Sequence, residues 1–216
     1  MPNWCNNILS VIGPKEVVDL FVAKARGTRA RYKPDEWEKR HGFGKQDPEV
    51  YELCFNALSP VPDNVLEAGY NGGGINVPGS GYRWQSDNWG TKWEASELTA
   101  DRVDDRHVRY TFNTAWAPPE GVIRHASIDF PALSFLLSFS EEFPSRGRML
   151  YKGGRRRVYV EETCPERSEI PGLEEAGDDD DACYAAYEAW QDHYVDLHDD
   201  WIQEFEGDKD AVAKAS

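Results

Sequence analysis

The sequence of 216 residues predicts an α+β fold, an antiparallel sheet with helices on one face, followed by a long acidic helix. Three observations predict it. Strands and helices follow a split βαβ order along the body of the chain. Eight Trp, ten Tyr and nine Phe supply enough apolar surface for a core. Charge is uneven: residues 1–160 hold 21 Lys and Arg against 20 Asp and Glu, and residues 161–216 hold 3 against 19.

Local patterns place the elements of the body. Trp4–Ile12 is rich in apolar and β-branched residues and predicts a strand that Gly13-Pro14 ends. Pro14 suits the first turn of a helix that runs to about Arg26. The remaining expected elements are a strand at Val50–Phe55, a strand pair at Glu94–Leu98 and His107–Ala115, a helix at Glu120–Ile128, a strand at Ala132–Ser140, and a hairpin of Arg146–Lys152 and Arg155–Glu161 around Gly153-Gly154.

Composition divides the chain into a body and a tail. The body spans 1–162 and contains a charged insertion at 28–49 and a Gly-rich loop at 63–87. Residues 163–216 form an acidic linker and an amphipathic C-terminal helix, and Ala182–Phe205 is expected to be one continuous helix. Its apolar stripe, with spacings of 4, 3, 4, 3 and 4, is Cys183, Tyr187, Trp190, Tyr194, Leu197 and Trp201.

The stripe is too apolar to stay in water, and three uses are open. Packing on the open face of the sheet is favoured over pairing in a dimer and over docking on a partner protein. The partner-binding candidates are Tyr187, Trp190, Tyr194, Leu197 and Trp201, with the carboxylates Asp192, Asp196, Asp199 and Asp200.

Three short motifs resemble signatures of the YubB-like proteins of phages and plasmids. They are Met1-Pro2-Asn3-Trp4-Cys5-Asn6-Asn7, Trp89-Gly90-Thr91-Lys92-Trp93 and Asn113-Thr114-Ala115-Trp116-Ala117-Pro118-Pro119. The resemblance covers residues 1 to about 153 and implies a ferredoxin-like domain and an origin in a mobile genetic element. It implies no catalytic residue. The acidic tail and the insertion 28–49 lie outside the matching motifs.

A tryptophan-rich segment is the candidate ligand site, with Trp84, Asn88, Trp89, Lys92 and Trp93 as its residues. Exposed rings beside a lysine could stack on nucleobases. The favoured alternative is that these rings close the core beneath the Gly-rich loop, because Trp is usually largely buried and the local positive charge is thin. A pocket lined by Trp84, Trp89 and Trp93 would favour ligand binding, whereas solid packing of the rings would argue against it.

A basic patch lies near the end of the body and consists of Arg146, Arg148, Lys152, Arg155, Arg156 and Arg157. It could bind nucleic-acid phosphate. Contact with the acidic tail is favoured by about two to one, because the tether gives the tail a high effective concentration.

Other reactive groups give little support for catalysis or metal binding. Pro2 is a low-probability catalytic candidate, because removal of Met1 would expose a secondary amine. The four cysteines are scattered without Cys-x-x-Cys spacing, so neither a disulfide framework nor a metal site is expected. No cofactor is expected. With no signal peptide or membrane-spanning segment expected, we predict a cytoplasmic protein of the host cell.

These observations favour a non-enzymatic accessory protein of a phage or plasmid that binds another macromolecule. Its specific form would be an acidic inhibitor that occupies a basic groove on a host nucleic-acid-binding or defence complex. The partner would then be a host or phage protein, and a dimer through the C-terminal helix stays open. The alternatives are a nucleotide-binding or enzymatic domain using the Trp cluster, and a single-stranded nucleic-acid binder.

Overall fold

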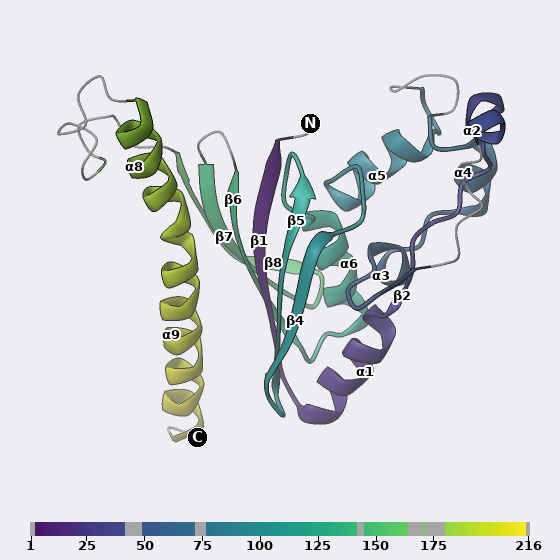
Figure 1. Cartoon of the computed structure of the whole chain (residues 1–216). Coiled ribbons are helices and arrows are strands. Elements are labelled where there is room, and N and C mark those ends of the chain that lie inside the picture. The colour runs from purple at the N-terminus through teal and green to yellow at the C-terminus, as the bar shows by residue number, and fades with distance from the viewer. Residues whose placement is uncertain are drawn as a thin grey trace.

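A six-stranded antiparallel sheet stands between two helical layers in the computed structural model of the chain (Figure 1). The structure describes residues 3–41, 49–71, 77–141, 145–163, 170 and 180–214. Its strands are β1 (Trp4–Ile12), β4 (Ser96–Asp104), β5 (His107–Ala115), β6 (Ser134–Glu141), β7 (Ser145–Lys152) and β8 (Arg155–Thr163), in the order β4-β5-β1-β6-β7-β8.

The four strands β4-β5-β1-β6 form the split βαβ unit that the sequence predicts. Strand β1 lies at the centre, where Ile12 pairs with His107 of β5 and with Ser134 of β6. Helix α1 (Lys15–Ala25) follows β1, and helix α6 (Glu120–Asp129) joins β5 to β6. The hairpin of β7 and β8 extends this unit. The ferredoxin-like arrangement is therefore confirmed, with the expected hairpin added at its edge.

The main core fills the space between the sheet and the layer of α1, α3 (Phe55–Leu58), α4 (Asp63–Ala68), α5 (Gly81–Trp89) and α6. Its largest fully buried side chains include Trp89, Tyr110, Phe21 and Phe55. The rings of Phe21 and Phe135 meet edge to face at 5.4 Å, a preferred geometry for aromatic pairs. This layer carries the candidate site at one end of the sheet.

The opposite face of the sheet is partly covered by the acidic tail. Helices α8 (Asp180–Asp192) and α9 (Tyr194–Lys214) lie beside β6 and β7 (Figure 1). A small second cluster forms there from Ile12, Leu136 and Trp201. Of the three uses considered for the aromatic stripe, packing on the sheet of the same chain is the one observed.

Several local expectations were wrong. Val50–Phe55 is not a long strand: only β3 (Val50–Tyr51) pairs, with β2 (Gly27–Thr28), and α3 begins at Phe55. The expected Gly-rich loop 63–87 contains α4 and most of α5, and its residues 72–76 lie outside the described part. Strand β4 runs six residues beyond the expected end at Leu98, because a tight turn at Asp105-Arg106 returns the chain. The tail helix is interrupted at His193, between α8 and α9.

The expected helix at Glu120–Ile128 and the expected strand at Ala132–Ser140 are present as α6 and β6. Within the insertion 28–49, helix α2 (Glu36–His41) is described and residues 42–48 are not. The tail linker falls mostly outside the described residues, although Ile170 is buried. No helix among the described residues is long and apolar enough to cross a membrane.

Candidate functional site

Three sequence segments meet at the end of the sheet where β1 begins. The amide of Trp116 donates to the carbonyl oxygen of Asn3 at 2.9 Å, which joins the segment after β5 to the start of β1. The hydroxyl of Thr91 donates to the carbonyl oxygen of Ala115, also at 2.9 Å, and brings in the segment after α5. The three motifs are far apart in sequence, and one surface brings them together.

Buried polar side chains hold this junction. The Asn7 amide nitrogen donates to the carbonyl oxygen of Cys5 at 2.8 Å and to Oγ1 of Thr114 at 2.9 Å. Thr114 in turn donates to the carbonyl oxygen of Ala117 at 2.8 Å. Each of these polar groups gains a partner in place of water, so the motifs contain Asn and Thr at positions that need donors and acceptors.

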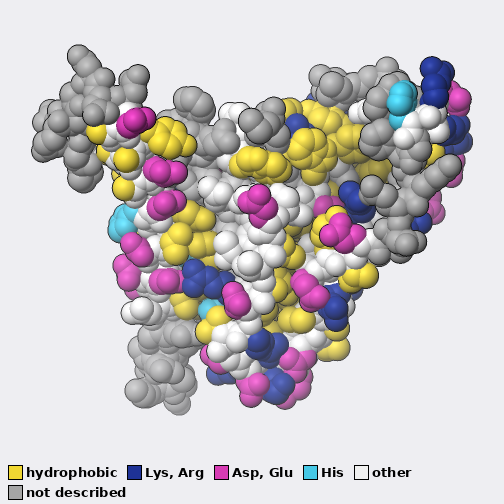
Figure 2. Space-filling model, in the orientation of Figure 1, with side chains coloured by type: hydrophobic (Ala, Val, Ile, Leu, Met, Phe, Trp, Pro, Cys, Tyr) yellow, Lys and Arg dark blue, Asp and Glu magenta, His cyan; other side chains and the backbone are white. Residues whose placement is uncertain are grey.

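The surface of the junction is aromatic, and we call Trp4, Lys92, Trp93 and Trp116 the aromatic end surface. Trp93 is 40% exposed and Trp116 is 50% exposed. The Lys92 ammonium lies 4.2 Å from the centre of the Trp93 ring and 3.7 Å from that of Trp116. The rings of Trp4 and Trp93 are 6.4 Å apart. Figure 2 shows hydrophobic side chains gathered at this end of the molecule.

The backbone at Trp116 adopts a conformation that large side chains avoid. Its φ is 76°, in the left-handed region, where a Cβ crowds the carbonyl oxygen at a cost of about 1–2 kcal/mol. The conformation turns the chain out of β5 and leaves the Trp116 ring beside Lys92, with Tyr82 against its edge at 6.4 Å. Strain of this kind is concentrated at binding sites.

The predicted ligand set divides between core and surface. Trp89 is fully buried, its indole nitrogen donates to the carbonyl oxygen of Ser59 at 2.9 Å, and its ring packs against Phe55 and Trp84. Asn88 is exposed and donates to the Trp84 carbonyl oxygen of its own helix. Trp84 and Trp89 therefore help to close the core, which is the favoured alternative, whereas Lys92 and Trp93 lie at the surface.

Two close backbone contacts set the position of the Lys92-Trp93 segment. Gly90 ends α5 with a φ of 88°, and a Cβ there would lie 2.9 Å from the carbonyl oxygen of Pro118. A Cβ on Gly121 of α6 would lie 2.0 Å from the carbonyl oxygen of Asn88. Because only glycine fits at both positions, α5 and α6 approach closely beneath the aromatic end surface.

Nucleophilic chemistry has little support in this region. Burial is the main cause that raises the pKa of the Cys5 thiol far above its ordinary value. Burial also raises the pKa of Cys54 to about 12, and the nearby Glu94 carboxylate adds to this shift. Both thiols therefore stay protonated and unreactive near neutral pH. Pro2, the predicted catalytic candidate, lies outside the described residues.

The partner-binding candidates of the tail lie on two sides of its helices. Tyr194 and Trp201 are buried against the sheet and Leu197 is partly buried, whereas Tyr187 is 38% exposed. Trp190 is partly buried, and its ring lies 4.3 Å from the guanidinium of Arg146. The carboxylates Asp192, Asp196, Asp199 and Asp200 are exposed. Figure 2 shows acidic side chains along these helices.

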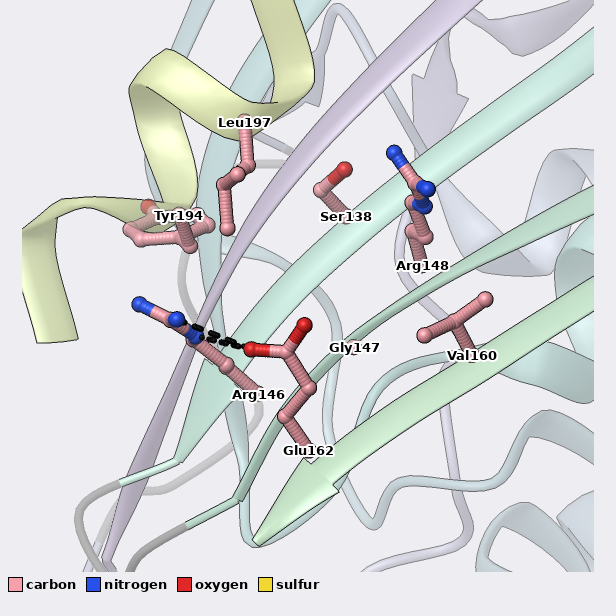
Figure 3. Close-up of a pocket in the computed structure, with 8 residues that line it drawn as sticks. All are labelled: Ser138, Arg146, Gly147, Arg148, Val160, Glu162, Tyr194 and Leu197. Carbon is pink, nitrogen blue, oxygen red and sulfur yellow. Dashed lines mark hydrogen bonds and ion pairs between the residues drawn. The ribbon is translucent and has the colours of Figure 1, made fainter. Parts of the chain in front are cut away.

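The basic patch does not act as one unit. Arg146 pairs with Glu162 at 2.8 Å (Figure 3). The Arg148 guanidinium lies 5.4 Å from the centre of the Trp201 ring. Arg156 pairs with Glu120 on the other face of the sheet at 3.0 Å. Lys152, Arg155 and Arg157 are exposed. The expected contact between the basic patch and the tail thus involves only Arg146 and Arg148. These arginines contact the Trp190 and Trp201 rings and the Trp190 carbonyl oxygen, and not the carboxylates of the tail.

Sequence reasoning missed two groups at the tail–sheet contact. Arg109 of β5 pairs with Asp199 at 2.7 Å. His198 is fully buried, with its Nδ1 atom 2.7 Å from Oγ of Ser138 and its Nε2 atom 2.9 Å from Oγ of Ser10. Burial, followed by the nearby Arg109, lowers the pKa of His198 to about 3. The one sequence signal was a histidine on the apolar stripe, one residue after Leu197.

Among the described residues no group of His, Cys, Asp and Glu could hold a metal ion.

Comparisons with known proteins support the fold. Residues 88–186 match the family model of the ferredoxin-like domain in Api92-like protein. The crystal structure of a protein api92 from Yersinia pseudotuberculosis superposes with a TM-score of 0.57 and 11% identity, covering 76% of this chain and 99% of that one. The comparison with curated proteins found no match. These findings bring no evidence for a YubB-like relationship or for a phage or plasmid origin. They show that the chain contains a ferredoxin-like domain similar to that of Api92-like proteins.

Proposed function

We propose that this protein is a non-enzymatic binding protein that holds another protein at its aromatic end surface. One observation carries the proposal: Lys92 lies against the rings of Trp93 and Trp116, and Trp4 packs beside Trp93, at the point where all three sequence motifs meet. Trp and Tyr are enriched among residues that dominate protein interfaces, because they bury large areas with few rotatable bonds. An accessory role in a phage or plasmid, with a host or phage protein as partner, rests on the resemblance of the motifs.

The charge of the site favours a protein over a nucleic acid as its ligand. Lys92 is the single cation among the four residues of the aromatic end surface, so this surface attracts phosphate weakly. Near the site, Arg83 is paired with Asp87 at 2.8 Å, and Lys92 is held between two rings. An aromatic surface of low local charge suits a partially apolar protein surface.

Two exposed tryptophans allow a direct test. Trp93→Ala and Trp116→Ala should each reduce partner recovery from the producing cell at least about tenfold, the effect of a typical hot-spot residue. Tyr184→Ala is the matched control, because Tyr184 is 70% exposed on α8, away from this surface. All variants are compared at a temperature at which their unfolding curves show them folded. Recovery of the same partner by both tryptophan variants at the wild-type level would contradict the proposal.

A second candidate function is favoured by the orientation of the tail. Because Tyr194, His198 and Trp201 face the sheet, the exposed carboxylates of α8 and α9 lie toward solvent. Such a row could occupy a basic groove of a nucleic-acid-binding or defence protein, as an acidic inhibitor would. A triple variant should then bind the basic partner less tightly and with a weaker dependence on salt: Asp192→Asn, Asp196→Asn and Asp200→Asn. Loss of binding in the Trp93 variant alone would assign the function to the aromatic end surface instead.

A further inference from the structure

The sheet face beneath the tail combines the small apolar cluster with a part that is rich in arginine and in uncharged polar side chains. Three arginines lie on it: Arg109 on β5, and Arg146 and Arg148 on β7. Cross-strand pairing places Ser140 beside Arg146 and Ser138 beside Arg148. Amides and hydroxyls lie around them, and we call this part of the sheet the arginine face: Asn6, Ser10, Arg109, Thr111, Asn113, Ser138, Ser140, Arg146 and Arg148. Two carboxylates adjoin it, because Asp101 pairs across the strands with Arg109 and Glu162 with Arg146.

The tail covers only part of the arginine face. Asn6 and Thr111 are exposed, whereas Ser138 and Ser140 are buried. Figure 2 shows a broad area of uncharged polar side chains and backbone beside the tail helices. The arginine face is therefore open to solvent in one part and covered by the tail in another.

The tail occupies this face through contacts that a nucleotide chain can also make. The Asp199 carboxylate accepts from Arg109 at 2.7 Å, where a phosphate oxygen would fit. The Trp190 ring lies 4.3 Å from the Arg146 guanidinium, and the Trp201 ring lies 5.4 Å from that of Arg148. Nucleobases stack on arginine in the same way. The Arg146 Nη1 atom also donates to the Trp190 carbonyl oxygen at 2.8 Å, as it could to a base edge.

The seat of the tail is incompletely filled. A pocket remains beneath α9, lined among others by Ser138, Arg146, Arg148 and Tyr194 (Figure 3). The Arg148 guanidinium is directed away from the Arg146–Glu162 pair and makes no ion pair with any described residue. Oγ of Ser140 is buried and has no hydrogen-bond partner in the described part of the chain. Unpaired polar groups of this kind gain stability from a polar ligand.

The tail is also separable from the main core. Its apolar contact is the small cluster of Ile12, Leu136 and Trp201, apart from the large cluster on the other face. The hydrophobic residues packed against the small cluster are only partly buried: Leu150, Val158, Ile202 and Phe205. Elements with few buried apolar contacts open at lower free energy than the core does.

We propose that the arginine face binds single-stranded nucleic acid, and that α8 and α9 are a tethered competitor that occupies part of it. The two ring-on-guanidinium contacts favour a nucleotide chain over an acidic peptide, because bases supply planar rings together with the negative charge. The tether keeps the local concentration of the tail high, so the free protein binds nucleic acid weakly.

The test measures binding of a fluorescent 20-nucleotide oligothymidylate to the full chain at low salt. In the release variant, Trp190→Ala with Asp199→Asn, the oligonucleotide should bind at least about tenfold more tightly than in the wild type, because the competitor is weakened. The matched control is Tyr184→Ala with Glu188→Gln, which removes an exposed ring and an exposed carboxylate and should leave binding unchanged. Trp201→Ala is a second release variant, because its ring lies in the small cluster.

Two further measurements identify the surface and the ligand class. Adding Arg148→Ala to the release variant should abolish its tighter binding of the oligonucleotide. Adding Arg124→Ala, at an exposed position on α6, should preserve the tighter binding. A plot of the logarithm of the binding constant against the logarithm of the salt concentration should have a slope of about −2, the value for three phosphate contacts to a single strand. Unchanged binding in both release variants overturns the proposal. Equal binding of poly-aspartate overturns the assignment to nucleic acid and points to an acidic protein ligand.

Discussion

The Nε2 atom of His198 lies 2.9 Å from Oγ of Ser10, which joins α9 to the central strand β1 across 188 residues of sequence. The ring is fully buried, and its other nitrogen bonds to Ser138. Arg109 and His107 are the nearby groups that oppose a positive charge on it. The tail is thus held at its centre by a neutral histidine between two serines.

The seat of His198 makes stability depend on pH. Because the folded pKa is about 3 and the ordinary value is 6.5, the unfolded chain binds the proton more tightly. The stabilisation from the neutral ring is complete above pH 6.5 and is lost as pH falls toward 3, by up to about 1.4 kcal/mol per pH unit. His198→Gln should remove this dependence in urea unfolding between pH 6.5 and 4. His193→Gln, at an exposed position of the tail, should retain it.

Trp116 gives a second prediction, about backbone strain. Its φ of 76° disfavours any residue with a Cβ, so Trp116→Gly should be more stable than Trp116→Ala by about 1 kcal/mol. Both variants lose the contacts with Lys92 and Tyr82, and their difference therefore isolates the backbone. Denaturant unfolding of the two proteins measures it. An alanine variant as stable as the glycine variant would show that Trp116 is unstrained in solution.

Glu94 should make the stability of the protein depend on pH in the direction opposite to that of His198. Its carboxylate accepts from the amides of Phe55 at 2.6 Å and Asn56 at 3.0 Å, yet burial outweighs these bonds and raises its pKa to about 7. The folded state then binds the proton more tightly than the unfolded state. Its contribution to stability is present below pH 4.5 and is lost as pH rises through about 7.

Glu94→Gln should flatten this part of the pH profile, measured as the free energy of unfolding between pH 4.5 and 8. It should also cost about 1 kcal/mol throughout, because one of the two amides loses its acceptor. Glu97→Gln is the control, since Glu97 is exposed and bonds to Asn113. An unchanged profile in Glu94→Gln would place the titration elsewhere.

The sequence predicted the sheet well and the site only in part. Strands such as β1 and the β7–β8 hairpin have dense apolar runs or a Gly-Gly turn, which are local signals. Helix α5 lacks one, because its glycines and polar residues are typical of a loop, and packing of Trp89 on Phe55 decides its structure. Of the aromatic end surface, the sequence predicted Lys92 and Trp93 but not Trp4 and Trp116, because these rings become adjacent only after β1 and β5 pair.

Gly121 tests whether close approach of α5 and α6 positions that surface. Helix propensity alone predicts that Gly121→Ala stabilises the protein by up to about 1 kcal/mol. The structure predicts the opposite sign, a loss of about 1–3 kcal/mol, because the new Cβ would lie 2.0 Å from the Asn88 carbonyl oxygen. Arg124→Ala, at an exposed position of the same helix, should change stability little. Because displacement of α5 also moves Gly90 and Lys92, Gly121→Ala should weaken partner binding even at temperatures where it is folded. A variant that is stabilised and binds normally would show that the two helices do not set the aromatic end surface.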